Sequence, residues 1–124
     1  MSHFTKIEVK IDSLEALEEA LEQMGYEAIT GTHTMRNDYG QSREVELEVK
    51  DLPVGFIMND EGELEMEADW YGTGINGDNF AQEVTQLHSK YKTLDSLKKD
   101  SWKVKKETTK EDGTIKLEVS RWSS

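Results

Sequence analysis

Alternating apolar and polar residues predict most of the strands in this 124-residue chain. Residues 4–11, for example, place Ile7, Val9 and Ile11 on one side and charged residues on the other, which is the pattern of a half-buried strand. Alternation or a short apolar run predicts further strands at residues 26–29, 44–49, 54–58, 64–70, 102–104 and 115–119. Because most of these segments have one apolar face, they favour a sheet with one buried side.

Two segments have helical spacing instead. Over residues 14–24, apolar residues recur every three or four positions, which predicts a helix. Asp12 and Ser13 supply capping oxygens before it, with Glu15 three positions after Asp12 as in a capping box. Gly25 follows the last apolar residue and is expected to end the helix.

A second helix is expected to begin at Asp78, after a loop over residues 71–77 that contains three glycines. Its apolar positions continue past Thr93, where a break in the helix is expected. The polar stretch over residues 31–43 is interpreted mostly as a long hairpin loop, and turn residues at 59–62 and 110–113 predict two tighter hairpins.

The elements follow the order strand, helix, four strands, helix, two strands. We therefore predict an α+β fold, an antiparallel sheet with two helices packed on one face, formed by a single domain over residues 1–124. The spacing of apolar residues at 17–28 is weakly similar to that at 94–104, which leaves open the alternative of two related halves.

Charge narrows the range of partners. The chain has 15 Lys and Arg against 26 Asp and Glu, a net charge of −11, which argues against direct binding to nucleic-acid phosphates or anionic membranes. Residues 1–89 hold 5 basic and 20 acidic side chains, a net −15, whereas residues 90–124 hold 10 and 6, a net +4. A protein partner with a basic surface fits this balance best.

Several classes of site are excluded or not indicated. Without cysteine, the chain has no disulfide, thiolate metal site or cysteine nucleophile. No secretory signal or membrane-spanning apolar run is present, so a cytoplasmic location is expected. The chain has no phosphate-binding loop, no catalytic signature and no histidine pair at metal-ligand spacing, so we expect neither an enzyme nor a cofactor.

The acidic strands are the main candidate for a functional surface. If their carboxylates share one exposed sheet face, repulsion between them should favour a basic partner. The predicted partner-binding residues are Glu44, Glu46, Glu48, Glu63, Glu65, Glu67, Asp69 and Tyr71. The alternative is a mixed, solvated face in which lysines of adjoining strands interleave with the glutamates, namely Lys6, Lys10, Lys103, Lys105 and Lys116. Asp60, Glu61 and Glu63 could also gather a hard cation, although the segment lacks the pattern of a calcium loop.

Several motifs together resemble a known family. They are Met1-Ser2-His3-Phe4, Gly25-Tyr26, Gly55-Phe56-x2-Asn59, Leu64-x-Met66-x-Ala68-Asp69, Val84-Thr85-Gln86-x4-Tyr91 and Glu111-Asp112-Gly113-x-Ile115-x-Leu117-x-Val119-x-Arg121-Trp122. The chain resembles, over nearly its whole length, the hypothetical chloroplast reading frame thirty-five family of cyanobacteria, algal plastids and cyanophages. The resemblance implies no established activity and no catalytic residue, and it implies the stroma for a plastid member or the host cytoplasm for a phage member.

Three functions remain open on the sequence. The leading hypothesis is an accessory protein without catalysis that binds a protein partner through the acidic face and the loop at 71–77. One rival is a phage-type inhibitor that imitates DNA and blocks a nucleic-acid enzyme. The other is a small-molecule or metal-binding protein with its pocket between sheet and helices. Edge strands that pair between copies also leave a homodimer open.

Overall fold

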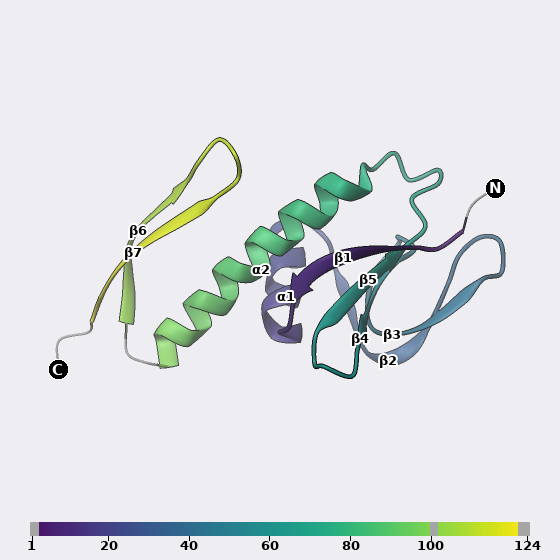
Figure 1. The fold of residues 1–124 in the computed structure, drawn as a ribbon, viewed down its shortest axis with the longest axis horizontal. Coiled ribbons are helices and arrows are strands. Elements are labelled where there is room, and N and C mark those ends of the chain that lie inside the picture. Colours follow the sequence, from purple (N-terminus) through teal and green to yellow (C-terminus); the bar gives the residue numbers. More distant parts are fainter. Residues whose placement is uncertain (1–2, 100–101, 122–124) are drawn as a thin grey trace.

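The computed structural model describes residues 3–99 and 102–121 and confirms the predicted α+β class and element order (Figure 1). The elements are β1 (Thr5–Ile11), α1 (Leu14–Gln23), β2 (Ala28–Arg36), β3 (Ser42–Val49), β4 (Val54–Met58), β5 (Leu64–Ala68), α2 (Gly77–Lys99), β6 (Trp102–Thr109) and β7 (Ile115–Arg121). Met1, Ser2 and Trp122 of the family-like motifs lie outside the described residues.

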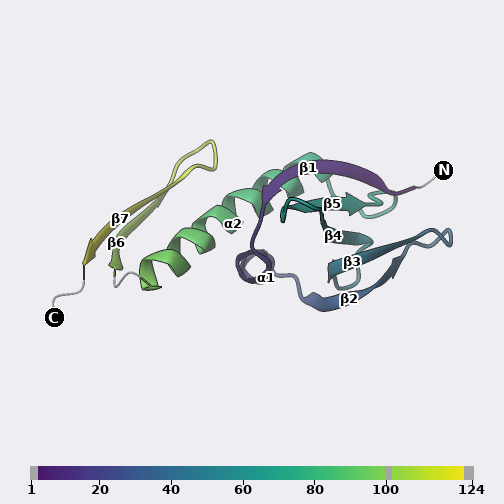
Figure 2. The same ribbon diagram turned by 60° about the horizontal axis from the view of Figure 1, so that its bottom comes forward.

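Five strands form an antiparallel sheet in the order β1-β5-β4-β3-β2. Both helices lie on one face of it, as predicted, and α1 connects the two edge strands (Figure 2). The main core lies between this face and the helices. It includes Leu17 and Leu21 of α1, Phe80 and Val84 of α2, and Ile11, Leu47, Val49, Val54, Phe56, Leu64 and Met66 of the strands.

The ends of α1 follow from local hydrogen bonds. Ser13 is the N-cap, and its Oγ accepts the N–H of Ala16 at 3.2 Å, so the predicted capping box of Asp12 and Glu15 is wrong. At the other end, Gly25 has φ +88°, and the N–H of Tyr26 donates to the carbonyl of Leu21 at 2.9 Å. Glycine adopts this left-handed backbone without strain, so the predicted C-terminal cap is confirmed.

The longer helix, α2, differs from the prediction at two points. Its N-terminus is capped by Asn76, whose Oδ1 accepts the N–H of Asn79 at 3.1 Å, whereas Asp78 lies in the first turn. The helix continues through Thr93, whose hydroxyl donates to the carbonyl of Ser89 at 2.8 Å within the helix. The second half of α2 therefore extends beyond the sheet as one unbroken rod (Figure 1).

The C-terminal strands β6 and β7 form a separate two-stranded sheet beside α2 (Figure 1). Lys90 of α2 pairs with Glu107 at 2.7 Å, and Ile115 packs against the main core. Residues 17–28 continue into the five-stranded sheet, whereas residues 94–104 continue into this hairpin, so the two segments do not occupy equivalent places. Lys103, Lys105 and Lys116 therefore belong to a different sheet from the acidic strands.

The β2–β3 hairpin is longer than predicted. Residues 31–36 belong to β2 and pair with β3, so only residues 37–41 form the loop. The strand was missed because Gly31 and polar residues dominate it, yet threonine suits strands and Met35 is fully buried. A register shift between Thr30 and His33 marks an irregularity in β2 at Gly31, which has φ +92°.

The far part of this hairpin lies over the face of the sheet that is turned away from the helices. Val54 and Phe56 belong to the main core, so Gly55 between them points to the opposite face. A Cβ at Gly55 would stand 2.6 Å from a methyl group of Val45 and 2.9 Å from Met35. Phe4, Met35 and Val45 form a second buried cluster there, with Ile57 packed against it. This opposite face is called the second face below.

Candidate functional site

Some of the predicted acidic residues lie on the second face, and the hairpin covers part of that face. Glu67 pairs with Arg43 of the hairpin at 3.3 Å, and the Glu67 side chain is only 14% exposed. Arg43 also lies 5.1 Å from the centre of the Phe4 ring, in a cation–π contact. On the hairpin itself, Glu48 pairs with His33 at 2.8 Å. These carboxylates have partners within the chain.

The other glutamates of β3 differ from each other. The carboxylate of Glu46 accepts the N–H of Met58 at 2.7 Å, where the pairing of β3 with β4 has ended. Glu46 thus satisfies a backbone donor at the start of the β4–β5 turn. Glu44 is exposed, opposite Thr34 on β2. The structure therefore does not place all the predicted residues in one patch.

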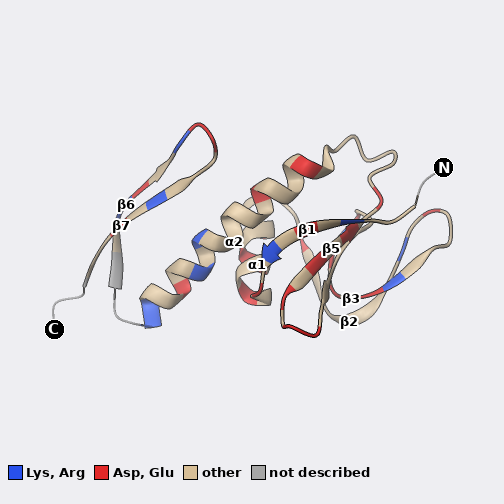
Figure 3. Ribbon diagram, in the orientation of Figure 1, with Lys and Arg blue, Asp and Glu red and all other residues tan. Residues whose placement is uncertain are grey.

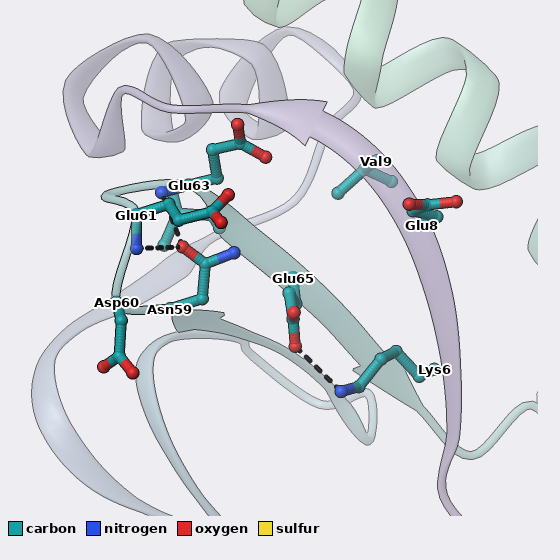
Figure 4. A pocket seen from close by; sticks show the side chains of 9 residues that line it. Lys6, Glu8, Val9, Asn59, Asp60, Glu61, Glu63 and Glu65 are labelled. Atoms are coloured by element: carbon teal, nitrogen blue, oxygen red, sulfur yellow. Dashed lines mark hydrogen bonds and ion pairs between the residues drawn. The ribbon is translucent and has the colours of Figure 1, made fainter.

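The uncovered part of the second face is an acidic hollow next to the β4–β5 turn (Figure 4). It opens because β1 bulges away from β5: Ile7 pairs with Met66 and Ile11 with Leu64, so residues 8–10 lie opposite Glu65 alone. The hollow has a volume of about 630 Å³. It is lined by Lys6, Glu8, Val9, Asn59, Asp60, Glu61, Glu63, Leu64 and Glu65.

Asn59 holds the turn that forms one wall of the hollow. Its Oδ1 accepts the N–H of Glu61 at 2.9 Å and that of Glu63 at 3.0 Å (Figure 4). Its own N–H donates to the carbonyl of Glu63 at 2.8 Å, and Gly62 takes the left-handed backbone that closes the turn. The side chain of Asn59 therefore positions the acidic residues around it, and its role is structural.

The charges of the hollow are strongly unbalanced. Lys6 pairs with Glu65 at 2.8 Å; this contact raises the pKa of Lys6 and lowers the pKa of Glu65, mainly through the hydrogen bond. In the part of the chain that the structure describes, no ion pair involves the other four acidic side chains, which are all exposed: Glu8, Asp60, Glu61 and Glu63. Five carboxylates and one ammonium give the lining a net charge of −4.

The hard cation considered for Asp60, Glu61 and Glu63 has a different candidate place. Among the described residues, carboxylates close enough to share an ion are found at Glu15 and Glu19 of α1 and Asp95 of α2. Burial, followed by Asp95 and Glu15, raises the pKa of Glu19. This cluster adds to the acidic surface of α1, which Figure 3 shows beside the lysine-rich second half of α2.

Asp69 and Tyr71 lie at the opposite end of β5 from the hollow. Asp69 is buried and accepts a hydrogen bond from Asn37 of the β2–β3 loop at 3.0 Å. Tyr71 is 67% exposed, and its ring lies against that of Tyr39. Asn37 and Tyr39 were not predicted as site residues because residues 31–43 were interpreted mostly as a long hairpin loop. One signal in the sequence could have indicated them: Asn-x-Tyr at 37–39 has the same pattern as Asp-x-Tyr at 69–71.

His88 of α2 is buried. It is 1% exposed, and its Nε2 accepts the N–H groups of Asp12 and Ser13 at 3.3 and 3.2 Å. Burial lowers its pKa against the opposing effect of Asp12. His88 therefore fixes the segment between β1 and α1 to α2, just beyond the bulge of β1.

The comparisons with known proteins identify relatives but no function. The chain is 27% identical over 126 residues to the uncharacterized protein ycf35 of Cyanophora paradoxa, covering 98% of each chain. It is 26% identical over 127 residues to the uncharacterized protein ycf35 of Pyropia yezoensis, covering 99% of each. No solved structure matches. In the described part of the chain, no helix is long and apolar enough to cross a membrane.

A family model also matches residues 20–118, and it is described as a protein of unknown function, DUF1257. The match includes all of β2 to β5, the whole of α2 and most of the C-terminal hairpin. The chain therefore belongs to the DUF1257 family.

Proposed function

We propose that this chain is a non-catalytic accessory protein that docks a basic surface of a partner protein at the acidic hollow. The observation that carries the proposal is the charge of the hollow: one lysine faces five carboxylates, four of which have no ion pair among the described residues. A partner's arginine or lysine side chains would supply the missing positive charge.

The shape of the hollow supports this assignment. Its volume of about 630 Å³ is large enough for long side chains, and it lies on the surface next to a turn held by Asn59. Because hydrogen bonds already hold these turn and strand residues in place, they lose little conformational entropy on binding, which favours affinity. Each exposed ion pair contributes at most about 1 kcal/mol, so several pairs must form together.

The two rival functions have less support. A DNA mimic needs long rows of uncompensated carboxylates, whereas Arg43 and His33 interrupt the rows at Glu67 and Glu48. A ligand pocket between sheet and helices would compete for space with the apolar side chains that fill this region, such as Phe56, Leu64 and Phe80.

The test is affinity capture from a cyanobacterial lysate at low and at high salt. The bait is compared with a hollow variant, Glu8→Gln, Asp60→Asn, Glu61→Gln and Glu63→Gln, all of which are exposed. A control variant removes four other exposed carboxylates, by Glu18→Gln, Glu22→Gln, Glu83→Gln and Glu111→Gln, and so has the same net charge.

A protein retained by the native chain and the control variant, but lost with the hollow variant and at high salt, would support the proposal. A protein that the hollow variant retains as well as the native chain does would refute it.

A further inference from the structure

Two loops at the far end of the sheet carry the same local arrangement. In the β2–β3 loop, the side-chain oxygen of Asn37 accepts the N–H of Tyr39 at 3.1 Å. In the loop after β5, the carboxylate of Asp69 accepts the N–H of Tyr71 at 3.2 Å. Each is an Asx turn, in which an Asn or Asp side chain bonds the backbone two residues on. Each turn thus sets the direction of a tyrosine.

The two turns are joined through their buried side chains. The amide of Asn37 donates to Asp69 at 3.0 Å, with Asn37 8% and Asp69 4% exposed. Asn37 also accepts the N–H of Gln41 at 2.9 Å and donates to the Gln41 side chain at 2.9 Å. Buried polar groups that are satisfied in this way hold their surroundings in one arrangement. The two loops therefore form one rigid unit.

This unit presents two large aromatic side chains to solvent. Trp70 packs inward on Phe80, with ring centres 5.3 Å apart, which leaves its neighbour Tyr71 pointing out. Tyr39 is 59% and Tyr71 67% exposed, and their rings meet edge to face with centres 6.5 Å apart. Exposed, pre-positioned tyrosines are common at sites that bind partners. These two are called the tyrosine pair.

The charges around the tyrosine pair select its ligand. A separate depression, beside the tyrosine pair, has a volume of about 880 Å³. Its ionisable side chains other than the tyrosines are Arg36, Asp38, Glu48, Asp51 and Asp69. Glu48 pairs with His33, and Asp69 is buried and bonded to Asn37, so the acidic groups that face solvent here are Asp38 and Asp51. An anionic ligand is disfavoured, whereas a cation with an apolar stem is attracted by both carboxylates and ring faces.

We propose that the tyrosine pair and the surrounding carboxylates form a second binding site, which takes an arginine side chain from an extended segment of a partner protein. The guanidinium group stacks on an aromatic face and bonds to carboxylates, and its stem packs on the second ring. This site lies at the other end of β5 from the acidic hollow, and it does not depend on the function proposed for the hollow.

The probe is a capped peptide, acetyl-Gly-Gly-Arg-Gly-Gly-amide, with a citrulline peptide as the neutral analogue of the same shape. The readout is the NMR signals of the four tyrosine rings in the full chain, labelled on tyrosine. Tyr39 and Tyr71 should shift and saturate with the arginine peptide, and Tyr26 and Tyr91 should remain unchanged as internal references. Citrulline should bind roughly three- to tenfold more weakly, because it lacks the charge.

Two variants complete the test. Tyr71→Leu removes a ring that is mostly exposed, so the fold should persist while binding falls roughly three- to tenfold. The hollow variant should bind the arginine peptide as the native chain does, which separates this inference from the proposed function. Absence of saturable shifts at Tyr39 and Tyr71, or equal binding of citrulline, would overturn the inference. A preference for a short single-stranded oligonucleotide over the arginine peptide would also overturn it.

Discussion

The two halves of the second face of the sheet both carry glutamates of β5 but differ in what covers them. In the half under the β2–β3 hairpin, Glu67 pairs with Arg43, and Phe4, Met35 and Val45 form a buried cluster. In the open half, the acidic hollow has four carboxylates without ion pairs among the described residues. Where the hairpin covers the sheet, a glutamate of β5 forms an ion pair that contributes to stability. Where nothing covers the sheet, the carboxylates are exposed to solvent and accessible to a partner.

The covered half depends on Gly55, and its substitution should have the largest effect. The methyl group of Gly55→Ala would overlap with Val45 and Met35, so we expect a loss of about 2 kcal/mol of unfolding free energy in urea denaturation. Combining it with Val45→Ala should cost less than the sum of the two single changes, because the methyl group then has room.

Gly31→Ala is the control for this change. A Cβ at Gly31 meets nothing within 4 Å, and its cost of about 1 kcal/mol comes from φ +92° alone. If Gly55→Ala cost no more than Gly31→Ala, the hairpin would not be packed on the second face as described.

Two histidines, one near each half, should make the free energy of unfolding depend on pH in opposite directions. His88 anchors β1 beside the open half, and burial lowers its pKa. Its contribution is complete above the unfolded pKa of about 6.5 and is lost as the pH falls through its lower folded value. His88→Gln should cost about 1 to 2 kcal/mol at pH 7.5 and should reduce the loss of stability between pH 7 and 5.

The contribution of His33, on the covering hairpin, to stability should change with pH in the opposite direction. Its pKa is raised, first by the hydrogen bond to the Gly31 carbonyl and then by Glu48. Its contribution is complete below about pH 6.5 and is lost as the pH rises through the raised folded value. His33→Gln should therefore lower stability at pH 5.5 more than at pH 8, measured by urea denaturation. The same pH dependence for both variants would contradict these environments.

The smallest expected changes in stability come from replacing one carboxylate in each half. Glu67→Gln removes the charged partner of Arg43 and should cost about 1 kcal/mol, since the pair is only partly shielded from water. Glu63→Gln removes an exposed charge from an acidic hollow and should cause no loss of stability. Thermal unfolding at low and high salt would measure both, and a larger loss for Glu63→Gln would reverse the assignment of the two halves.

Local patterns predicted the elements well because caps, turns and alternation act over a few residues. Ser13, Gly25 and the turn at 59–62 illustrate this. The covering of the second face was not predictable in the same way, because it depends on contacts such as Arg43 with Glu67, which are far apart in the sequence. The polar composition of residues 31–36 also concealed a strand.

The candidate site was predicted only in part for the same reason. Glu63 and Glu65 were selected from their strand, and both line the hollow. Glu8 joins them because β1 bulges away from β5, and no local pattern indicated that bulge. Asp69 and Tyr71 were selected as part of the acidic face but belong with Asn37 and Tyr39 at the other end of the sheet.

The most direct test of docking at the acidic hollow is the affinity of the captured partner for the native chain, the hollow variant and the control variant, each measured over a range of salt concentrations. The hollow variant should bind about tenfold more weakly at low salt and lose much of its salt dependence, whereas the control variant should bind as the native chain does. Equal weakening in both variants would mean that the partner responds to net charge alone, and it would contradict docking at the hollow.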